Sequence, residues 1–217
     1  MNHRGKIQSG SCPFFPQRGT LKTMNTIKAI LLMMLALAGT GFTTKGIWVI
    51  DAESQLTIQG STNVNDFTCK ISYCTGTDTL QYIENNTSSE FRFTRSRMTV
   101  PVRSFDCGSK PISKDFWKTL QAETHPNLDI NFISLQNVYF RDKSRVKGIV
   151  DITLAGVTTR YAICYEVTLK PNGNVLLKGS HAVNFSDFRL IAPEKLQGLI
   201  KVREMLNVEF NLILKEV

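Results

Sequence analysis

The sequence predicts an all-β protein, and we interpret it as an eight-stranded antiparallel β-barrel with one or two short helices. Leu56 and Ile58 alternate with polar residues, as in a strand that buries one face. A break at 60–63 follows, and a second alternating run starts at Phe67. Runs of this kind recur toward the C-terminus, and no set of catalytic residues accompanies them. We therefore expect the function to lie in the interior of the barrel.

Two long strands follow in the second half of the chain. Apolar residues alternate over residues 146–154 and again over residues 161–169. Ala155–Thr158 is the turn between them, and Pro171–Asn174 is a hairpin signal after the second. Further alternating segments cover residues 175–185 and 206–214, and a short helical turn is predicted at Pro193–Gly198 between them.

An earlier segment changes its phase of alternation. Phe91 and Phe93 share one phase, whereas Met98, Val100 and Val102 share another. A bulge or bend near residues 94–97 would reconcile the two phases, as is common where a barrel strand turns. Ile130 and Phe132 start the strand that follows the helix.

One amphipathic helix over residues 114–121 interrupts the strands. We expect Ser113 to cap it, Asp115 to suit its first turn, and Phe116, Trp117 and Leu120 to form its apolar side. His125, which precedes a proline, marks its end. A single short helix that covers one end of the barrel is typical of a lipocalin-like fold.

The first 44 residues have a different character. Residues 24–44 show a short basic start, an apolar run over residues 29–38 and small residues at Ala36–Ala38, which is the layout of a secretory signal peptide. The apolar run is about half of the ~20 residues that a membrane-spanning helix needs, so we predict no permanent membrane anchor. Residues 1–23 are interpreted as an extension from an upstream start codon. The mature domain is then residues 45–217, and it is periplasmic or secreted.

Charge excludes one class of function. Five basic residues and no acidic residue precede Thr44, so 21 basic and 18 acidic residues remain, a net charge of +3. Nucleic-acid binders concentrate positive charge on one face. Here lysine and arginine are scattered along alternating strands, so we predict no nucleic-acid partner.

Four cysteines remain in the mature domain, an even number that suggests disulfides in an exported protein. Cys69 and Cys107 occur in similar Phe-x-Cys motifs at strand ends, so we favour the pairing Cys69–Cys107. Cys74 and Cys164 both fall on polar faces and form the second predicted pair. Free, partly buried thiols are the alternative.

Several segments, taken in order, resemble those of one known family. They are Trp48-Val-Ile-Asp51, the run Ser54–Cys69, Val100-Pro-Val-Arg-Ser-Phe-Asp-Cys107, the helix, His125-Pro-Asn-Leu-Asp-Ile-Asn-Phe132, Val146-Lys-Gly148, Leu154-Ala-Gly-Val-Thr158, Asp187-Phe-Arg-Leu190 and Val208-Glu-Phe-Asn-Leu212. Residues 47–215 in this order resemble the YceI-like family of exported polyisoprenoid-binding proteins. The chain departs from the family pattern at Glu53-Ser54, where a His-Ser pair is usual, and at Arg189, where Asp-Phe is usually followed by glycine.

The resemblance implies a barrel whose long apolar tunnel holds an isoprenoid chain, such as a polyprenyl phosphate or a quinone. The candidate tunnel-lining residues are Phe67, Phe93, Val100, Phe116, Trp117, Leu120, Phe132, Ile152, Ile163, Tyr165, His181, Phe185, Phe188 and Phe210. Ordinary core packing is the alternative for each. His181 is in phase with apolar neighbours, so its ring is either satisfied within the core or donates a hydrogen bond to a head group.

The sequence thus favours a non-catalytic binding protein whose cargo is an isoprenoid lipid. No cofactor, metal site or catalytic residue is predicted, because no Cys-x-x-Cys pair and no nucleophile motif is present. The alternatives are a filled barrel that acts as an envelope interaction module, and a lipid-modifying enzyme. The strand edges either close within a monomer or are shared across a homodimer.

Overall fold

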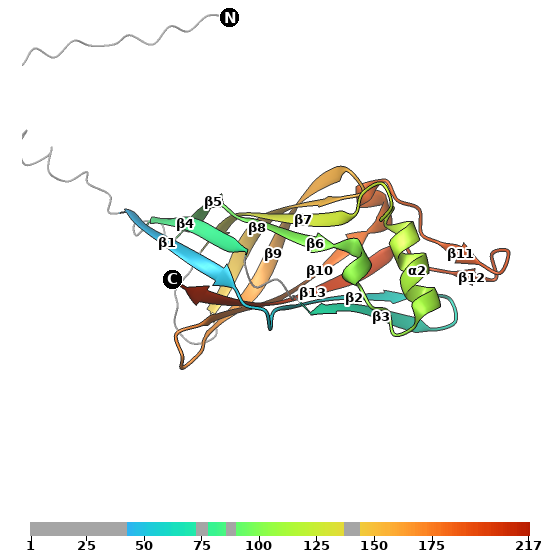
Figure 1. The fold of residues 1–217 in the computed structure, drawn as a ribbon, viewed down its shortest axis with the longest axis horizontal. Coiled ribbons are helices and arrows are strands. Elements are labelled where there is room, and N and C mark those ends of the chain that lie inside the picture. Colours follow the sequence, from blue (N-terminus) through green and yellow to red (C-terminus); the bar gives the residue numbers. More distant parts are fainter. Residues whose placement is uncertain (1–42, 73–77, 86–89, 137–143) are drawn as a thin grey trace, which may run out of the picture. The chain divides into compact units, whose positions relative to one another are not determined.

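The computed structural model describes residues 43–72, 78–85, 90–136 and 144–217 (Figure 1). They belong to the second of the two compact units into which the chain divides, Gly41–Val217. The predicted extension, all but the last two residues of the predicted signal peptide, and Cys74 lie outside the described residues.

The described residues form strands, one α-helix and two short 3-10 helices. The elements are β1 (Thr43–Ile50), β2 (Gln55–Ser61), β3 (Asp66–Ser72), β4 (Thr79–Asn85), β5 (Glu90–Arg95), β6 (Arg97–Pro101), η1 (Val102–Ser104), α2 (Lys110–Thr119), β7 (Asn127–Gln136), β8 (Ser144–Leu154), β9 (Val157–Leu169), β10 (Val175–Asn184), η2 (Phe185–Phe188), β11 (Glu194–Lys195), β12 (Ile200–Lys201) and β13 (Met205–Glu216).

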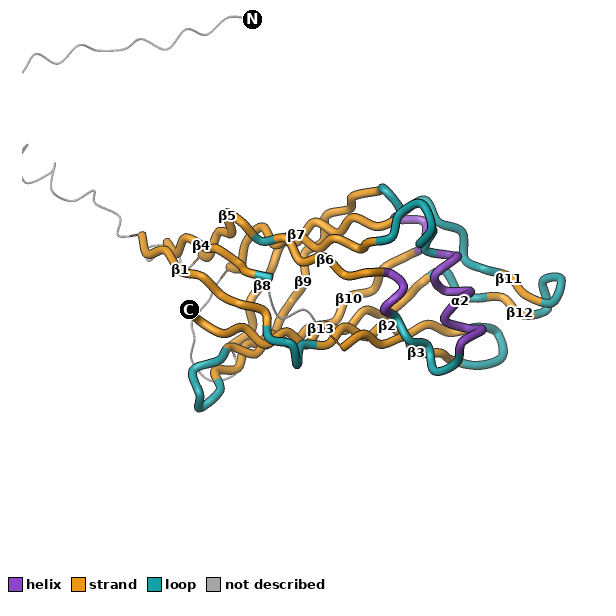
Figure 2. The backbone as a smooth tube through the Cα atoms, viewed as in Figure 1, coloured by secondary structure: helices purple, strands orange, loops and turns teal. Residues whose placement is uncertain are grey.

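Eight of these strands form a closed ring, which confirms the predicted all-β, lipocalin-like fold. Antiparallel pairing runs in the order β1-β4-β5-β7-β8-β9-β10-β13, and β13 pairs back with β1 (Figure 2). The predicted alternation is present: β8 and β9 bury every second side chain over most of their length. The turn, predicted over Ala155–Thr158, is only two residues long, because β9 already begins at Val157; it holds Ala155 and Gly156 at φ 49° and 77°, which suits a tight hairpin.

The predicted bend near residues 94–97 is also confirmed. Gln81 pairs with Arg95 but Tyr82 pairs with Phe93, so Thr94 is an extra residue in β5. The strand then breaks at Ser96 and continues as β6, which pairs with β7. The Ser96 hydroxyl donates a hydrogen bond to the side-chain oxygen of Asn131 at 2.9 Å. The bulge therefore lets one continuous strand turn along the barrel wall.

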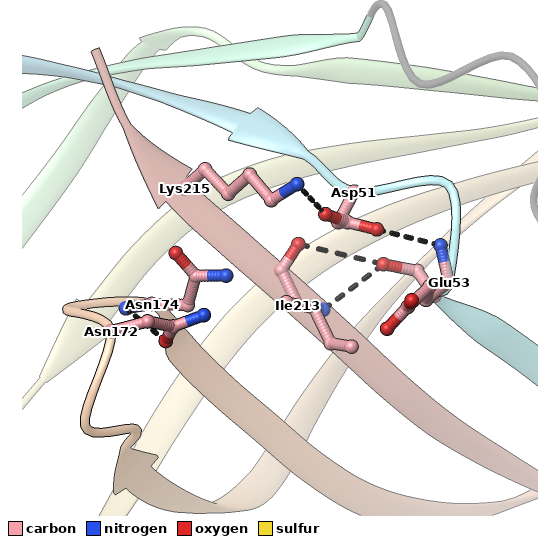
Figure 3. Close-up of polar contacts among 7 residues, drawn as sticks. Asp51, Glu53, Asn172, Asn174, Ile213 and Lys215 are labelled. Atoms are coloured by element: carbon pink, nitrogen blue, oxygen red, sulfur yellow. Dashed lines mark hydrogen bonds and ion pairs between the residues drawn. The ribbon is translucent and has the colours of Figure 1, made fainter.

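β13 is shared by two successive strands, β1 and β2, and polar contacts hold the break between them (Figure 3). The buried Ser54 hydroxyl accepts a hydrogen bond from the Ile213 N–H at 3.0 Å. Asp51 forms an ion pair with Lys215 and accepts a hydrogen bond from the Glu53 N–H. These two partners hold the pKa of Asp51 below its usual value of 3.8. The contact therefore stabilises the fold above about pH 4 and is lost on further acidification.

At the α2 end the main sheet has two edge strands, β3 and β6 (Figure 1). The chain closes this gap covalently, because Cys69 of β3 forms a disulfide with Cys107, which lies between η1 and α2. Lys70 and Asp106 beside it exchange two backbone hydrogen bonds of 2.8 and 2.9 Å. The predicted Cys69–Cys107 pairing is confirmed.

The second predicted pairing, Cys74–Cys164, is not supported. Cys164 is a free and exposed cysteine. Its strand position is opposite Lys147 in the middle of β9, where alternation turns the side chain to the outer face of the sheet.

Local predictions for the helix and for Pro193–Gly198 were wrong. The helix, expected over residues 114–121 with Asp115 in its first turn, covers Lys110–Thr119 and has no acidic residue in that turn. Ser109, not Ser113, caps α2: its side chain accepts a hydrogen bond from the Ile112 N–H, and Pro111 occupies the first turn. Ser113 lies inside the helix and its hydroxyl accepts a hydrogen bond from the Cys107 N–H at 3.0 Å. The segment Pro193–Gly198 is not a helical turn. It contributes to the β11–β12 hairpin, whose tip holds three consecutive residues at positive φ.

The disulfide gives a direct stability test. The pair Cys69→Ala and Cys107→Ala should lower the free energy of unfolding by about 3–4 kcal/mol, because the bond restrains a 38-residue separation in the unfolded chain. Urea titration measures this difference. The control is the exposed Cys164→Ala, which should change stability by less than about 0.5 kcal/mol. Equal stability of the two variants would show that the bond does not hold this end of the barrel together.

Candidate functional site

A small apolar cavity lies inside the barrel at the α2 end. Its volume is about 60 Å³ and its accessible lining is apolar. The lining residues come from strands on opposite sides of the interior, from α2 and η2, and from the loops next to them. They are Leu56, Ile58, Phe105, Phe116, Leu120, Leu128, Ile130, Ile152, Leu154, Val183, Asn184, Phe185, Phe188, Leu190, Leu206, Val208 and Phe210.

A second, larger hollow opens at the same end. It measures about 230 Å³ and lies between α2, the β2–β3 turn and the β11–β12 hairpin, with mostly apolar walls. Phe116 of α2 and Phe185 of η2 line both hollows. These two rings therefore stand between the inner cavity and the outer hollow, which we call the mouth.

An aromatic cluster packs at the other end of the ring. Trp48 stacks on Phe91 with ring centroids 5.5 Å apart and lies 4.4 Å from Tyr82. Phe93 also belongs to the cluster, and its ring centroid lies 6.0 Å from that of Phe132. In the sheet, Trp48 of β1 is opposite the last residues of β13, whereas the first residues of β13 line the inner cavity. The interior is thus packed with aromatic rings at one end and hollow at the other.

Tyr165 of β9 lies against the inner wall of the sheet. A Cβ atom at Gly148 or at Gly179 would come within 2.6 or 2.8 Å of its ring, so only glycine on these neighbouring strands allows the ring to lie there. The ring also contacts Phe210, a cavity-lining residue, at 6.3 Å. Its hydroxyl is buried and has no hydrogen-bond partner among the described residues. Burial raises the pKa of this phenol above its usual value.

Asp187 of η2 holds together a second place where neighbouring strands of the wall separate. β9 and β10 pair only as far as Gly179, and η2 fills the space where they diverge. Asp187 of η2 accepts hydrogen bonds of 2.9 Å from the Tyr161 hydroxyl and the Asn184 N–H. Burial, and then this bond, raise the pKa of Tyr161. His181 packs edge-on against the Tyr161 ring at 5.1 Å, and it does not line the inner cavity.

The structure brings together six of the predicted lining residues around the inner cavity: Phe116, Leu120, Ile152, Phe185, Phe188 and Phe210. Phe67 lines the mouth instead. Phe93 and Phe132 belong to the aromatic cluster, and Val100 and Ile163 are fully buried elsewhere in the core. Trp117 turns away from the cavity, since its indole N–H donates to the Phe105 carbonyl at 2.9 Å and its ring borders an outer groove.

Apart from Leu120 and Ile152, sequence reasoning missed the aliphatic part of the lining. Leu56, Ile58, Leu206 and Val208 all line the cavity. Each belongs to a strand whose alternation was evident, so their phase was the available signal.

Two classes of feature are absent from the described ranges. No helix there has the length and apolar composition that a bilayer span requires. Over the same ranges, no three His, Cys, Asp or Glu side chains gather in a way that could hold a metal ion.

A family model described as the YceI-like domain matches residues 48–214. The chain belongs to the YceI-like family. A search of curated proteins gave no match.

Two solved structures share the fold of this YceI-like chain. BcnA of Burkholderia cenocepacia is 16% identical, with a TM-score of 0.56, over 76% of this chain and 98% of BcnA. A polyisoprenoid binding domain from Saccharophagus degradans, implicated in plant cell wall breakdown, is 10% identical, with a TM-score of 0.54. That match covers 79% of this chain and 99% of the other.

The two departures from the YceI-like pattern both lie outside the cavity. Glu53 is exposed in the turn between β1 and β2, while its neighbour Ser54 bonds to β13. Arg189 is exposed and ends η2 at φ 56°, a left-handed conformation that favours glycine. Phe188, between Asp187 and Arg189, keeps its place in the cavity wall. Neither substitution alters the apolar lining.

The conformation of Arg189 predicts a stabilising substitution. Arg189→Gly should raise the free energy of unfolding by about 0.5–1 kcal/mol, because relief of the left-handed strain exceeds the entropy that glycine adds to the unfolded chain. The matched control is Arg203→Gly, an exposed arginine that is not among the residues at positive φ. It should lower stability by about the same amount. A loss of stability in both variants, measured by urea unfolding, would contradict the conformational explanation.

Two tyrosines that differ in hydrogen bonding make a second matched pair. Tyr165→Phe should raise the free energy of unfolding by about 1–3 kcal/mol, because it removes a buried hydroxyl that has no hydrogen-bond partner among the described residues. Tyr161→Phe should instead lower it by about 1.5–3 kcal/mol, because a bond to the Asp187 carboxylate is lost. Chemical denaturation of both variants measures the difference, and a shared sign would refute this assignment of partners.

Proposed function

We propose that this protein is an exported, non-catalytic carrier or store that holds an isoprenoid lipid of the polyprenyl phosphate or quinone type. The observation that carries the proposal is the meeting of two apolar hollows at Phe116 and Phe185. Membership of the YceI-like family supports it, as does the fold shared with a domain described as polyisoprenoid binding.

The volumes define how cargo would enter. A pocket for a drug-sized ligand spans about 300–1,000 Å³, far more than the inner cavity alone. We infer that Phe116 and Phe185 swing aside on loading, which joins the cavity to the mouth. Apolar burial at roughly 25 cal/mol per Å² then holds the chain with few polar contacts.

The position of the polar groups sets the orientation of the cargo. The inner cavity presents apolar atoms, whereas Thr62, Asn65, Asp115 and Lys195 border the mouth. The isoprenoid chain therefore points inward and its head group stays near the mouth. Export to the periplasm or outside the cell fits the Cys69–Cys107 disulfide, since such bonds persist in oxidising compartments.

The small inner volume favours a second candidate function. A barrel whose interior is filled by its own side chains would act through its surface, as an interaction module of the cell envelope. This alternative requires no cargo and no movement of Phe116 or Phe185.

Mass spectrometry of an organic extract decides between the two functions. Residues 45–217, exported and purified, should release an isoprenoid at about one molecule per protein, and an unrelated exported control should release none. A clean extract, together with no binding of added quinone or polyprenyl phosphate, would favour the filled barrel.

A substitution inside the cavity tests where the cargo binds. Ile152→Phe places a larger side chain in the inner cavity and should weaken isoprenoid binding by at least about tenfold. Ile149→Phe makes the same change on the outer face of the same strand and should leave binding unchanged. Equal binding by the two variants in a ligand titration would move the cargo site away from this cavity.

A further inference from the structure

Exposed apolar side chains gather at the α2 end of the barrel, around the mouth. Three projecting segments carry them: the β2–β3 turn, the β11–β12 hairpin and α2 (Figure 1). Two further exposed apolar residues, Ile191 and Met205, precede and follow the β11–β12 hairpin in the chain. Together the exposed residues are Val64, Ile112, Ile191, Leu196, Leu199 and Met205, which we call the apolar rim.

The tip of the β11–β12 hairpin carries two leucines that do not pack into the core. Leu196 and Leu199 are 67% and 72% exposed. Leu196 also adopts a left-handed backbone conformation, with φ 50°. Exposed apolar side chains concentrated in this way are typical of surfaces that contact a membrane or a partner.

Polar contacts hold the rim together as one platform. Asn63 of the β2–β3 turn donates a hydrogen bond to the Leu199 carbonyl at 2.8 Å and accepts one from the Lys201 N–H at 2.9 Å. Lys195 of the hairpin forms a 2.8 Å ion pair with Asp115 of α2. These contacts therefore link the three segments to one another.

Charge around the rim favours an anionic partner. Lys110, Lys114 and Lys118 repeat every four residues along α2, so they lie on one side of the helix, and all three are exposed. None of them forms an ion pair with a described residue. Of the carboxylates near the rim, those of Asp115 and Glu194 form ion pairs with lysines of the hairpin, whereas exposed Asp66 and Glu204 form none with a described residue.

We propose that the α2 end docks on a lipid bilayer that carries anionic head groups, so that the mouth faces the membrane. The leucines of the hairpin tip enter the interfacial region, and the α2 lysines contact anionic head groups. A bilayer fits better than a protein partner because the apolar groups stand on separate segments. The lysine row lies on the side of α2 that turns away from the mouth, where Lys114 and Lys118 border an outer groove, so it would meet head groups at the edge of the docked face. The proposal adds to the proposed function a place where cargo is exchanged.

Vesicle binding tests the proposal with the purified mature domain. Wild-type protein should co-sediment with phosphatidylcholine vesicles that contain about 30 mol % phosphatidylglycerol, and less with pure phosphatidylcholine, because the lysines need anionic head groups. Binding should weaken as salt rises to about 0.5 M. Absence of binding to the anionic vesicles would overturn the proposal, and a soluble protein partner would become the occupant to seek.

Two double variants separate the apolar contribution from the charge. Leu196→Ser with Leu199→Ser should weaken binding about tenfold, because both tip leucines lose their apolar contact. The control pair is Leu169→Ser with Val217→Ser, two exposed apolar residues at the other end of the sheet, and it should bind as wild type does.

Lys114→Glu with Lys118→Glu should also weaken binding to anionic vesicles about tenfold, whereas Lys147→Glu with Lys178→Glu on the outer wall should weaken it much less. Equal effects within either pair would contradict docking by this end.

Isoprenoid binding, measured separately on the same variants, distinguishes the two proposals. Leu196 and Leu199 line neither hollow, so their loss should leave cargo capacity in detergent unchanged. Cargo binding without vesicle binding would sink the docking proposal alone. Vesicle binding without any cargo would sink the carrier function and leave a membrane-associated barrel.

Discussion

Closure of the barrel at the α2 end is the constraint on which the interior depends. At the other end, backbone pairing between β1 and β13 completes the ring. At the α2 end β3 and β6 do not pair, and the chain joins them through Cys69–Cys107 and two backbone hydrogen bonds. The same link brings α2 across the opening, where Phe116 and Leu120 reach the cavity. The wall is thus covalently fixed next to the place where the interior is hollow.

Differences in packing along the barrel divide its interior by role. The aromatic cluster around Trp48 stabilises the end that the strands close by themselves. The aliphatic lining near β2 and the start of β13 leaves space, with Phe116 and Phe185 between that space and the mouth. Because a packed interior resists insertion, cargo would enter where the packing is loosest and where the fewest strands must move. That place is the end of the barrel that α2 covers.

Much of the fold could be predicted from alternation, because a half-buried strand repeats every two residues. The β8–β9 hairpin and the bend near residues 94–97 followed from phase and turn chemistry, and the Cys69–Cys107 pair followed from two similar Phe-x-Cys motifs at strand ends. The helix cap did not, because the sequence prediction began the helix after Ser113, whereas the structure begins it after Ser109 and bonds the Ser113 hydroxyl to the Cys107 N–H and the Ser109 carbonyl. Nor did the orientation of Trp117 or the hollow itself, because alternation tells which side chains face inward and not which of them leave space.

Photo-crosslinking with a diazirine-labelled isoprenoid, followed by peptide mass spectrometry, tests the central claim most directly. If the cargo occupies the α2 end of the barrel, adducts should fall on the segments that contain Phe116 and Phe185, and excess unlabelled isoprenoid should remove them. Adducts confined to the segments around Trp48 and Phe91, or spread over the outer wall without competition, would contradict an isoprenoid site behind the α2 cap.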